Sequence, residues 1–447
     1  MLLEFKIRNF RSFYHETVLS MVASKQRDHN DFLISTTSPA RRILPSAVIY
    51  GPNASGKTSL ILGFAFLKYI VETGNIRKQK GNLFSLALEL YPFIHEHKKF
   101  NEPIHCEISF LTEGMEFTYG ISIESKLEKN YNEGSRKIVY EFLRINQKEV
   151  FTRNDQNITL AKDKKALRLY KDKTSAALLE TLETQVNTNL EATDLFLSNA
   201  FKSAVNSEIA NKALYWFKEK LIPFIDFDES QLEIKLSESN SKRYFGYRNA
   251  VMRAMISHAD FGPQDIIFYV EGKDESNRNA QLRSMYKING GKGLAIPSEL
   301  MESKGTLKML GFSFPFVDAL KNGKVLVVDE LDASLHPDLI AAIVAVFNNR
   351  QINTKGAQLI FNTHNPIYLN NNLFRRDQIL FVSKNRNSYE SELYSLADFK
   401  TYGENAVRND EQLMKNYISG KYGAIPFVDF EAAIHEALRE NCPREEE

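Results

Sequence analysis

A glycine-rich turn, a lysine and a hydroxyl residue follow one another in the stretch "IYGPNASGKTSLIL" at 49–62. The spacing fits G-x-x-x-x-G-K-[ST], with an apolar strand-like run before it and an apolar helical pattern after it. The glycines let backbone N–H groups turn toward phosphates, while Lys57 can reach the β- and γ-phosphates and Thr58 can bind Mg²⁺. The segment predicts an ATP site with a helix N-terminus facing the phosphates. The residues expected around the nucleotide are Asn53, Ser55, Gly56, Lys57, Thr58 and Ser59.

A second group of chemically active residues lies in "VLVVDELDASLHP" at 325–337. Four apolar residues in a buried strand end at Asp329, whose carboxylate can hold Mg²⁺ through water. Glu330 follows directly and is placed to polarise an attacking water as a general base. Acidic pairs also cap ordinary strands, but this pair follows a P-loop in the same chain. We therefore predict Asp329 as a metal residue and Glu330 as catalytic.

His364 ends another apolar run, "AQLIFNTH" at 357–364. A lone histidine at a strand end is more often structural than functional. This one follows Glu330 by about one βαβ unit, so it is expected at the same edge of the sheet. We predict that His364 contacts the γ-phosphate or the attacking water.

The elements that must position these residues can be read from hydrophobic periodicity. The runs 324–331 and 357–364 with the Ala- and Ile-rich helix 338–348 between them give a β-α-β rhythm typical of a parallel sheet. A strand at 47–50 feeds the P-loop, and the helix after it should run to about Val71. The resulting prediction is an α/β fold built around a mixed sheet.

The other segments give predictions of differing clarity. Leu2 to Phe10 alternates as a strand, and short runs over 103–153 predict an antiparallel β-meander. Residues 24–42 look like a polar surface loop, and 160–221 should be mainly helical, with Pro223 breaking the last helix. The stretch 226–300 gives no clear assignment.

Composition and charge limit the class of protein. The 447 residues are 43% hydrophobic and 25% charged, with a net charge of +1, as in a soluble globular protein. This balance gives no global attraction to nucleic acid, so any nucleic-acid contact would need a local basic patch. Two widely separated cysteines, no signal peptide and no apolar run of about 18 residues predict a cytoplasmic location without a membrane span.

Together the motifs resemble those of ABC-type ATPases of the SMC/RecF/OLD group. "VVDELDASLHP" is similar to the Walker B motif and D-loop, with Asp332 matching the D-loop aspartate. His364 matches the switch histidine, and "LEFKIRNFRSF" is similar to the group's first strand. The resemblance implies a homodimer or higher oligomer in which the signature motif of one copy closes on the ATP of another. No long heptad array is present, so no coiled-coil arm is expected.

The stretch "ESKGTLKML" at 302–310 resembles the signature motif. Ser303 and Gly305 match the family's serine and second glycine, while Lys304 replaces the middle glycine. The resemblance implies that Ser303 and the start of the following helix face the γ-phosphate held by a partner copy. Alternatively, Ser303 is an ordinary helix N-cap.

With the C-terminal run at 396–426, the chain resembles bacterial ATP-binding proteins of AAA-domain family fifteen. Members accompany a separate effector, a nuclease or toxin, in phage-defence operons, such as the PARIS system and RloB-linked abortive infection. The implied fold is a P-loop NTPase of ABC-ATPase type with a helical lobe inserted between Walker A and the signature. The expected parts are 1–200 and 311–395 for the ATPase lobe, 201–310 for the signature lobe, and 396–447 for a C-terminal segment.

The resemblance leaves some positions and functions open. The expected Q-loop glutamine is missing, and Ser198 or Asn199 is a guess for its place. The residues after His364 contain no D-x-D pair, so we expect no Toprim nuclease. The leading interpretation is a defence ATPase that senses a trigger, which could be phage-derived, and holds its effector. The alternative is a RecF-like DNA-repair or DNA-end-binding ATPase, and a transporter subunit fits poorly.

Overall fold

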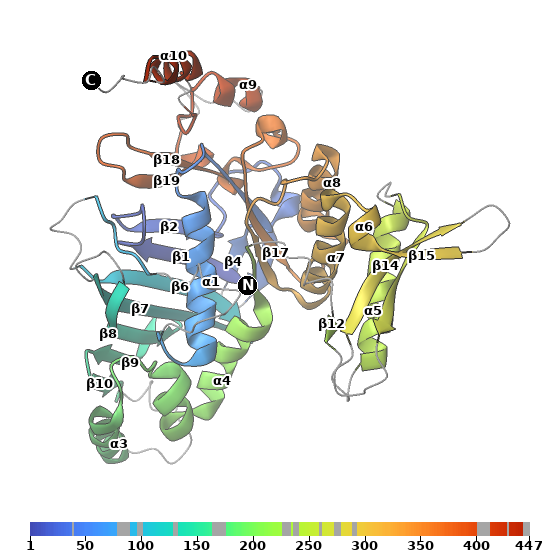
Figure 1. Ribbon diagram of the computed structural model, residues 1–447. Coiled ribbons are helices and arrows are strands. Elements are labelled where there is room, and N and C mark those ends of the chain that lie inside the picture. Colours follow the sequence, from blue (N-terminus) through green and yellow to red (C-terminus); the bar gives the residue numbers. More distant parts are fainter. Residues whose placement is uncertain are drawn as a thin grey trace, which may run out of the picture.

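The structure is a computed structural model, and two large β-sheets with one helix packed between them dominate it (Figure 1). It describes residues 1–37, 40–77, 90–95, 102–127, 133–162, 176–225, 234–235, 241–258, 262–271, 279–287, 293–399, 412–426 and 429–440. A smaller sheet lies to one side, next to the helices that cover the second large sheet. Every structural statement below concerns these residues.

The first large sheet is antiparallel and has the strand order β10-β9-β8-β7-β6-β1-β2. Its strands are β1 (Leu2–Arg8), β2 (Thr17–Ser20), β6 (Ile104–Thr112), β7 (Met115–Leu127), β8 (Glu133–Ile145), β9 (Lys148–Asn154) and β10 (Asn157–Leu160). Adjacent strands are linked mostly by tight turns, and their alternate residues point into one core. The predicted first strand and meander are both confirmed.

The second sheet carries the candidate site and has the order β11-β16-β17-β5-β18-β19. Its strands are β5 (Ser46–Tyr50), β11 (Leu221–Phe224), β16 (Val325–Val328), β17 (Gln358–Thr363), β18 (Ile379–Lys384) and β19 (Ser391–Ser395). All neighbours are parallel except β18 and β19. The carboxyl ends of β5, β16 and β17 therefore meet at one edge, which confirms the predicted parallel β-α-β unit.

Helix α1 (Lys57–Thr73) packs between the two large sheets. It is apolar around nearly its whole circumference, which explains why it is buried on all sides. The ring of Phe64 stacks on Phe5 of β1 with centroids 3.9 Å apart. Gly74, at a φ of +73°, ends the helix by adopting the left-handed conformation.

Helices α7 (Lys304–Asn322) and α8 (Pro337–Asn348) cover the other face of the second sheet. Residues of β16 alternate between the two sides: Val325 and Val327 face the core around α1, whereas Leu326 and Val328 face α7 and α8. The sheet thus separates α1 from α7.

The segment that the sequence left unassigned forms a small antiparallel sheet beside α7, seen at the right of Figure 1. It contains β12 (Ile234–Lys235), β13 (Asp265–Glu271), β14 (Asn279–Lys287) and β15 (Gly293–Pro297), with α5 (Ser241–His258) and α6 (Ser298–Met301). Met252 and Ile256 of α5 pack with Leu307 and Leu310 of α7. The region around 234–310, which was predicted as a helical lobe, therefore combines helices with a sheet in its described residues.

The prediction of an irregular loop over 24–42 was wrong in part. Two strands within it, β3 (Ile34–Thr37) and β4 (Ala40–Ile43), pair antiparallel, whereas residues 24–33 are irregular apart from the 3₁₀ turn Asn30–Phe32. The prediction of a mainly helical region that ends before Pro223 is confirmed for the described residues, since the last helical segment ends at Lys220; the residues that follow form β11, a parallel edge strand on β16. Proline is tolerated there because an edge strand has one side free of ladder hydrogen bonds.

The remaining elements connect or follow the sheets. They are α3 (Ala176–Asn189), α4 (Ser207–Tyr215), α9 (Leu413–Ile418) and α10 (Phe430–Glu440), the π-helical segments η3 (Leu197–Val205) and η4 (Trp216–Lys220), and the 3₁₀ turns Asn30–Phe32, Pro366–Tyr368, Arg376–Gln378 and Leu396–Asp398. Part of the C-terminal motif, 400–411, and most of the helical prediction before Ala176 lie outside the described residues. Within the described chain, no helix is both long and apolar enough for a membrane span.

Candidate nucleotide-binding site

The P-loop between β5 and α1 has the backbone that its glycines predict. Gly56 has a φ of +112°, and Ala54 also lies in the left-handed region at +59°. A Cβ on Gly51 would lie 2.3 Å from the carbonyl oxygen of Val382, and one on Gly56 would lie 2.7 Å from Ser12 Oγ. Side chains at either glycine would therefore distort the loop.

Lys57 is held inside this loop. Its Nζ donates to the carbonyl oxygens of Gly51 at 2.8 Å and Pro52 at 2.9 Å, and only 4% of the residue is exposed. Burial lowers the pKa of Lys57 to about 8, although the nearby carboxylates of Asp329 and Glu330 oppose the shift. The ammonium group is thus poised to gain stabilisation from an anion.

Thr58 and Asp329 lie together beneath the P-loop. The Thr58 hydroxyl donates to Asp329 Oδ1 at 3.2 Å, which brings the hydroxyl and the carboxylate to one point. The same Oδ1 accepts a hydrogen bond from the side-chain amide of Asn362. A hydroxyl beside a carboxylate is an all-oxygen donor set of the kind that Mg²⁺ prefers when phosphates supply further ligands. These residues fit a magnesium ion.

Glu330 leaves the end of β16 in an uncommon conformation. Its φ is +46°, in the left-handed region that residues other than glycine, asparagine and aspartate rarely adopt. Its backbone N–H donates to Asn362 Oδ1 at 2.5 Å, so Asn362 holds both members of the acidic pair. This role of Asn362 was not among the predictions, although its place in the "NTH" run beside His364 was a usable signal.

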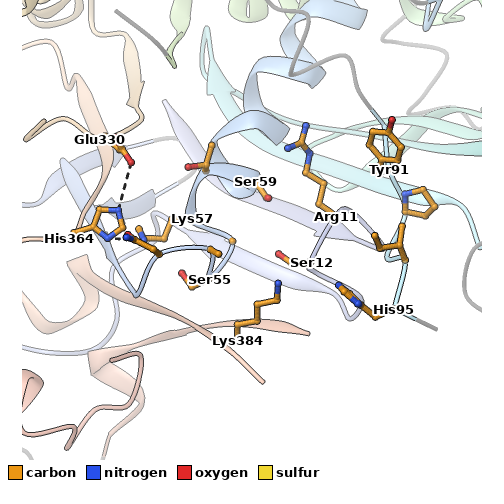
Figure 2. Close-up of a pocket in the computed structure, with 16 residues that line it drawn as sticks. Arg11, Ser12, Ser55, Lys57, Ser59, Tyr91, His95, Glu330, His364 and Lys384 are labelled. Carbon is orange, nitrogen blue, oxygen red and sulfur yellow. Dashed lines mark hydrogen bonds and ion pairs between the residues drawn. The ribbon is translucent and has the colours of Figure 1, made fainter. Parts of the chain in front are cut away.

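His364 connects the lysine to the glutamate. Its Nδ1 lies 3.3 Å from Lys57 Nζ, and its Nε2 lies 3.7 Å from a carboxylate oxygen of Glu330, as Figure 2 shows. The three side chains come from β5–α1, β16 and β17, whose ends meet at one edge of the sheet. The structure therefore brings together the residues that the sequence selected from three distant segments.

These side chains line a cavity of about 670 Å³ (Figure 2). Its lining residues are Arg11, Ser12, Asn53, Ala54, Ser55, Gly56, Lys57, Thr58, Ser59, Tyr91, Pro92, Ile94, His95, Glu330, His364 and Lys384. Ser12 Oγ and Ser55 Oγ are buried there without a hydrogen-bond partner among the described residues. Unpaired buried hydroxyls facing a P-loop suit an oxygen-rich ligand such as phosphate.

The cavity also contains groups that the sequence analysis did not select. Arg11, Tyr91, His95 and Lys384 line the side away from Glu330 in Figure 2. Arg11 belongs to the "NFRSF" run, which the sequence analysis used only as a strand marker. The others come from loops and from β18, and no local pattern links them to the P-loop.

Three predicted nucleotide residues, Ser303, Gly305 and Asp332, are not among the described residues that line this cavity. Ser303 is exposed and caps α7, accepting from Thr306 N at 3.1 Å. Asp332 instead accepts a 2.7 Å hydrogen bond from Thr363 Oγ1. The N-cap role of Ser303 is therefore present, and of the residues at this helix start only Ser303 and Lys304 are exposed, whereas Gly305, Thr306 and Leu307 are buried.

The guess for a Q-loop residue was wrong. Ser198 Oγ donates to the carbonyl oxygen of Val71, and Asn199 Nδ2 donates to that of Gly74 at 2.7 Å. Both acceptors are at the C-terminal end of α1. Since α1 has 17 residues and a helix rises about 1.5 Å per residue, this end lies roughly 25 Å from the P-loop.

Comparison with known proteins places the chain in a family. Residues 46–370 match the family model described as "AAA domain, putative AbiEii toxin, Type IV TA system". The chain belongs to this family. The match runs from β5 past His364 and includes the P-loop, the acidic pair and the histidine. It agrees with the predicted resemblance at the level of the AAA domain, under a different description from family fifteen.

Two SMC head structures are among the solved structures that match the chain, both with low sequence identity. One is described as the SmcHead bound to the C-winged helix domain of ScpA, with 12% identity, a TM-score of 0.39, and 88% of this chain and 97% of that chain covered. The SMC head domain from Thermotoga maritima has 15% identity and a TM-score of 0.36, covering 88% of this chain and 98% of that chain. No curated protein matches the sequence. The fold is that of a P-loop NTPase of ABC type, on the family match and the strand order described above.

Proposed function

We propose that this chain hydrolyses ATP to ADP and phosphate. The observation that carries the proposal is the meeting of Lys57, Glu330 and His364 in one cavity, where His364 lies 3.3 Å from Lys57 Nζ on one side and 3.7 Å from a carboxylate oxygen of Glu330 on the other. Lys57 and the P-loop N–H groups bind the phosphates. Thr58 and Asp329 would hold Mg²⁺, which would neutralise phosphate charge when bound.

Glu330 acts as the general base in this proposal. Its carboxylate reaches the cavity beside His364, and it is partly exposed, so water can approach it. The base takes a proton from the water as the water attacks the γ-phosphate. His364 hydrogen-bonds the γ-phosphate or the water and holds it in line. Asn362 fixes the backbone from which Glu330 extends.

We further propose that a second copy completes the site. Helix α7 lies on the opposite face of the second sheet from α1, and its exposed start, Ser303 and Lys304, does not line the cavity of its own chain. A helix N-terminus binds anions well, so this exposed start can face the γ-phosphate of another copy. Residues 1–200 and 311–395 then act as the ATPase lobe, 201–310 as the signature lobe and 396–447 as a C-terminal segment, with Asp332 near the joint between copies.

The biological proposal is a sensor and scaffold in bacterial anti-phage defence by abortive infection. The family description, with its putative AbiEii toxin and type IV toxin–antitoxin system, supports this setting. In the proposal, a separate nuclease or toxin binds the ATPase, and ATP turnover in the cytoplasm controls it. A phage-derived molecule would be the trigger.

Steady-state phosphate release by the purified protein tests the activity. Wild type should release phosphate from Mg²⁺–ATP, and Glu330→Gln should bind ATP but lose roughly 10²- to 10⁴-fold in rate. Glu299→Gln, an exposed carboxylate of α6, is the matched control and should behave as wild type. Wild-type turnover by Glu330→Gln would refute the assignment of the base.

Phage plating on cells that carry the native locus tests the defence role. Wild type should reduce plaque formation, Lys57→Ala should not, and affinity purification should recover the product of a neighbouring gene. Toxicity of this chain expressed alone would show that it is the effector itself. ATP hydrolysis stimulated by DNA ends, without phage protection, would instead favour the RecF-like alternative.

A further inference from the structure

Helix α7 touches the loop that carries Glu330 at two places. Lys308, in the second turn of α7, donates from Nζ to the carbonyl oxygen of Glu330 at 2.6 Å. One turn earlier, a Cβ on Gly305 would lie only 2.1 Å from the carbonyl oxygen of Ser334. The start of the signature helix therefore packs directly on residues 330–334 of its own chain.

The loop that receives these contacts is conformationally unusual. Glu330 and Ser334 both have positive φ, at 46° and 66°. Residues in sparsely populated conformations persist only when their surroundings hold them there. The Glu330 N–H is held by Asn362, and its carbonyl oxygen accepts from both Ala333 N and Lys308.

Lys308 is well suited to this task. The residue is only 9% exposed, so its hydrogen bond is shielded from water. A charged donor on a carbonyl oxygen forms one of the stronger protein hydrogen bonds. Lys308 extends from α7, which also packs on the second sheet, so the backbone position of Lys308 is held in place.

We propose that Lys308 is a positioning residue for Glu330, through which the signature helix of a copy sets the general base of that same copy. The inference rests on the proposed function. Lys308 does not itself line the cavity and, in this proposal, does not touch the nucleotide; it acts through its hydrogen bond to the backbone of Glu330.

The first experiment compares Lys308→Met, Lys308→Arg and the matched control Lys321→Met, an exposed lysine at the far end of α7. Lys308→Met should lower kcat roughly 10- to 100-fold with ATP affinity within about twofold of wild type. Lys308→Arg should recover part of the rate, and Lys321→Met should match wild type. Thermal melting checks folding, and Lys308→Gln replaces Lys308→Met if the latter unfolds.

The second experiment asks which copy needs the lysine. Lys57→Ala protein supplies a signature but no bound ATP, and Ser303→Arg protein supplies ATP and Glu330 but no signature. Their mixture has one working kind of site. Adding Lys308→Met to the Ser303→Arg copy should abolish its turnover, whereas adding it to the Lys57→Ala copy should leave most of it.

The outcomes of the two experiments distinguish failure of this inference from failure of the proposed function. Wild-type kcat for Lys308→Met, or loss of turnover when the change is on the Lys57→Ala copy, overturns the inference while leaving the ATPase proposal standing. An inactive wild type, or Glu330→Gln that turns over normally, overturns the proposed function and the inference with it.

Discussion

The Nε2 atom of His364 lies 3.7 Å from a carboxylate oxygen of Glu330. The other ring nitrogen lies 3.3 Å from Lys57 Nζ, so one imidazole spans the distance between the phosphate-binding lysine and the acidic residue. A ring in this place can sense the γ-phosphate through one nitrogen and orient water or Glu330 through the other. This arrangement gives the histidine a role distinct from that of the base.

His364→Ala should therefore slow turnover less than Glu330→Gln does. We expect kcat to fall roughly 10- to 100-fold, since a hydrogen bond to a charged group contributes about 1.5–3 kcal/mol. ATP affinity should change little because Lys57 and the P-loop remain. The measurement is steady-state phosphate release with His435→Ala, an exposed histidine of α10, as control. A kcat equal to wild type would remove His364 from the mechanism.

ATP affinity should fall as pH rises above about 8. The pKa of Lys57, lowered to about 8 by burial, means that the ammonium form is lost through this range, so binding must restore a proton. We expect up to about tenfold weaker binding per pH unit above 8, and little change below 7. Lys57→Arg, whose charge does not titrate here, should bind with a flatter pH profile. Equilibrium binding from pH 7 to 9.5 measures both.

The same lysine has the opposite effect on the free energy of unfolding. Its folded pKa lies below the unfolded value, so between about pH 8 and 10 the unfolded chain holds more protons than the folded one. The contribution of Lys57 to stability therefore increases with pH across this window. Weaker ATP binding together with an unchanged or higher melting temperature would separate lysine titration from unfolding, whereas parallel losses would contradict it.

Mixed oligomers test the composite site. Ser303→Arg should keep ATP binding but lose turnover, because the added bulk and charge stand at the exposed N-cap of α7, which does not line the cavity of the same chain. Lys57→Ala should lose binding. Mixing the two proteins should restore up to about a quarter to a half of the wild-type rate, depending on how freely the copies exchange. A monomer with full turnover, measured by sedimentation with ATP, would exclude the arrangement.

The sequence predicted the site most reliably where one strand end supplies the residue. Asp329 and His364 directly follow the apolar strands β16 and β17, and parallel strands place such ends at one edge. Thr58 reaches the same edge from β5 through the P-loop, which the glycine spacing predicts. The hydrogen bonds of Asn362 could not be predicted in this way, because they depend on the left-handed turn of the backbone at Glu330.

Other features depend on packing that no local pattern records. Ser198 and Asn199 were chosen by their order along the chain. In the structure they hydrogen-bond the C-terminal end of α1, which is the end remote from the P-loop. Likewise, no local pattern identifies Leu221–Phe224 as a strand after the preceding helical run. These residues form β11 because they pair with β16. The strands of the small sheet at 234–297 are separate in sequence, and each is stabilised by pairing with its neighbours in the sheet.

Asn362 provides the last test, because its one amide serves two acidic residues. Its Oδ1 accepts from the Glu330 N–H at 2.5 Å, and its Nδ2 donates to Asp329. Asn362→Ala removes both hydrogen bonds and should lower kcat roughly 5- to 100-fold, since an unpaired buried donor costs about 1–3 kcal/mol.

Asn362→Asp keeps the acceptor for Glu330 but places a carboxylate against Asp329. It should retain the geometry of the base while changing the Mg²⁺ concentration needed for half-maximal phosphate release. The two variants thus separate the base from the metal residue, and Asn371→Ala, outside the cavity, is the control. If both variants match wild type in kcat and in Mg²⁺ dependence, the acidic pair is positioned without Asn362.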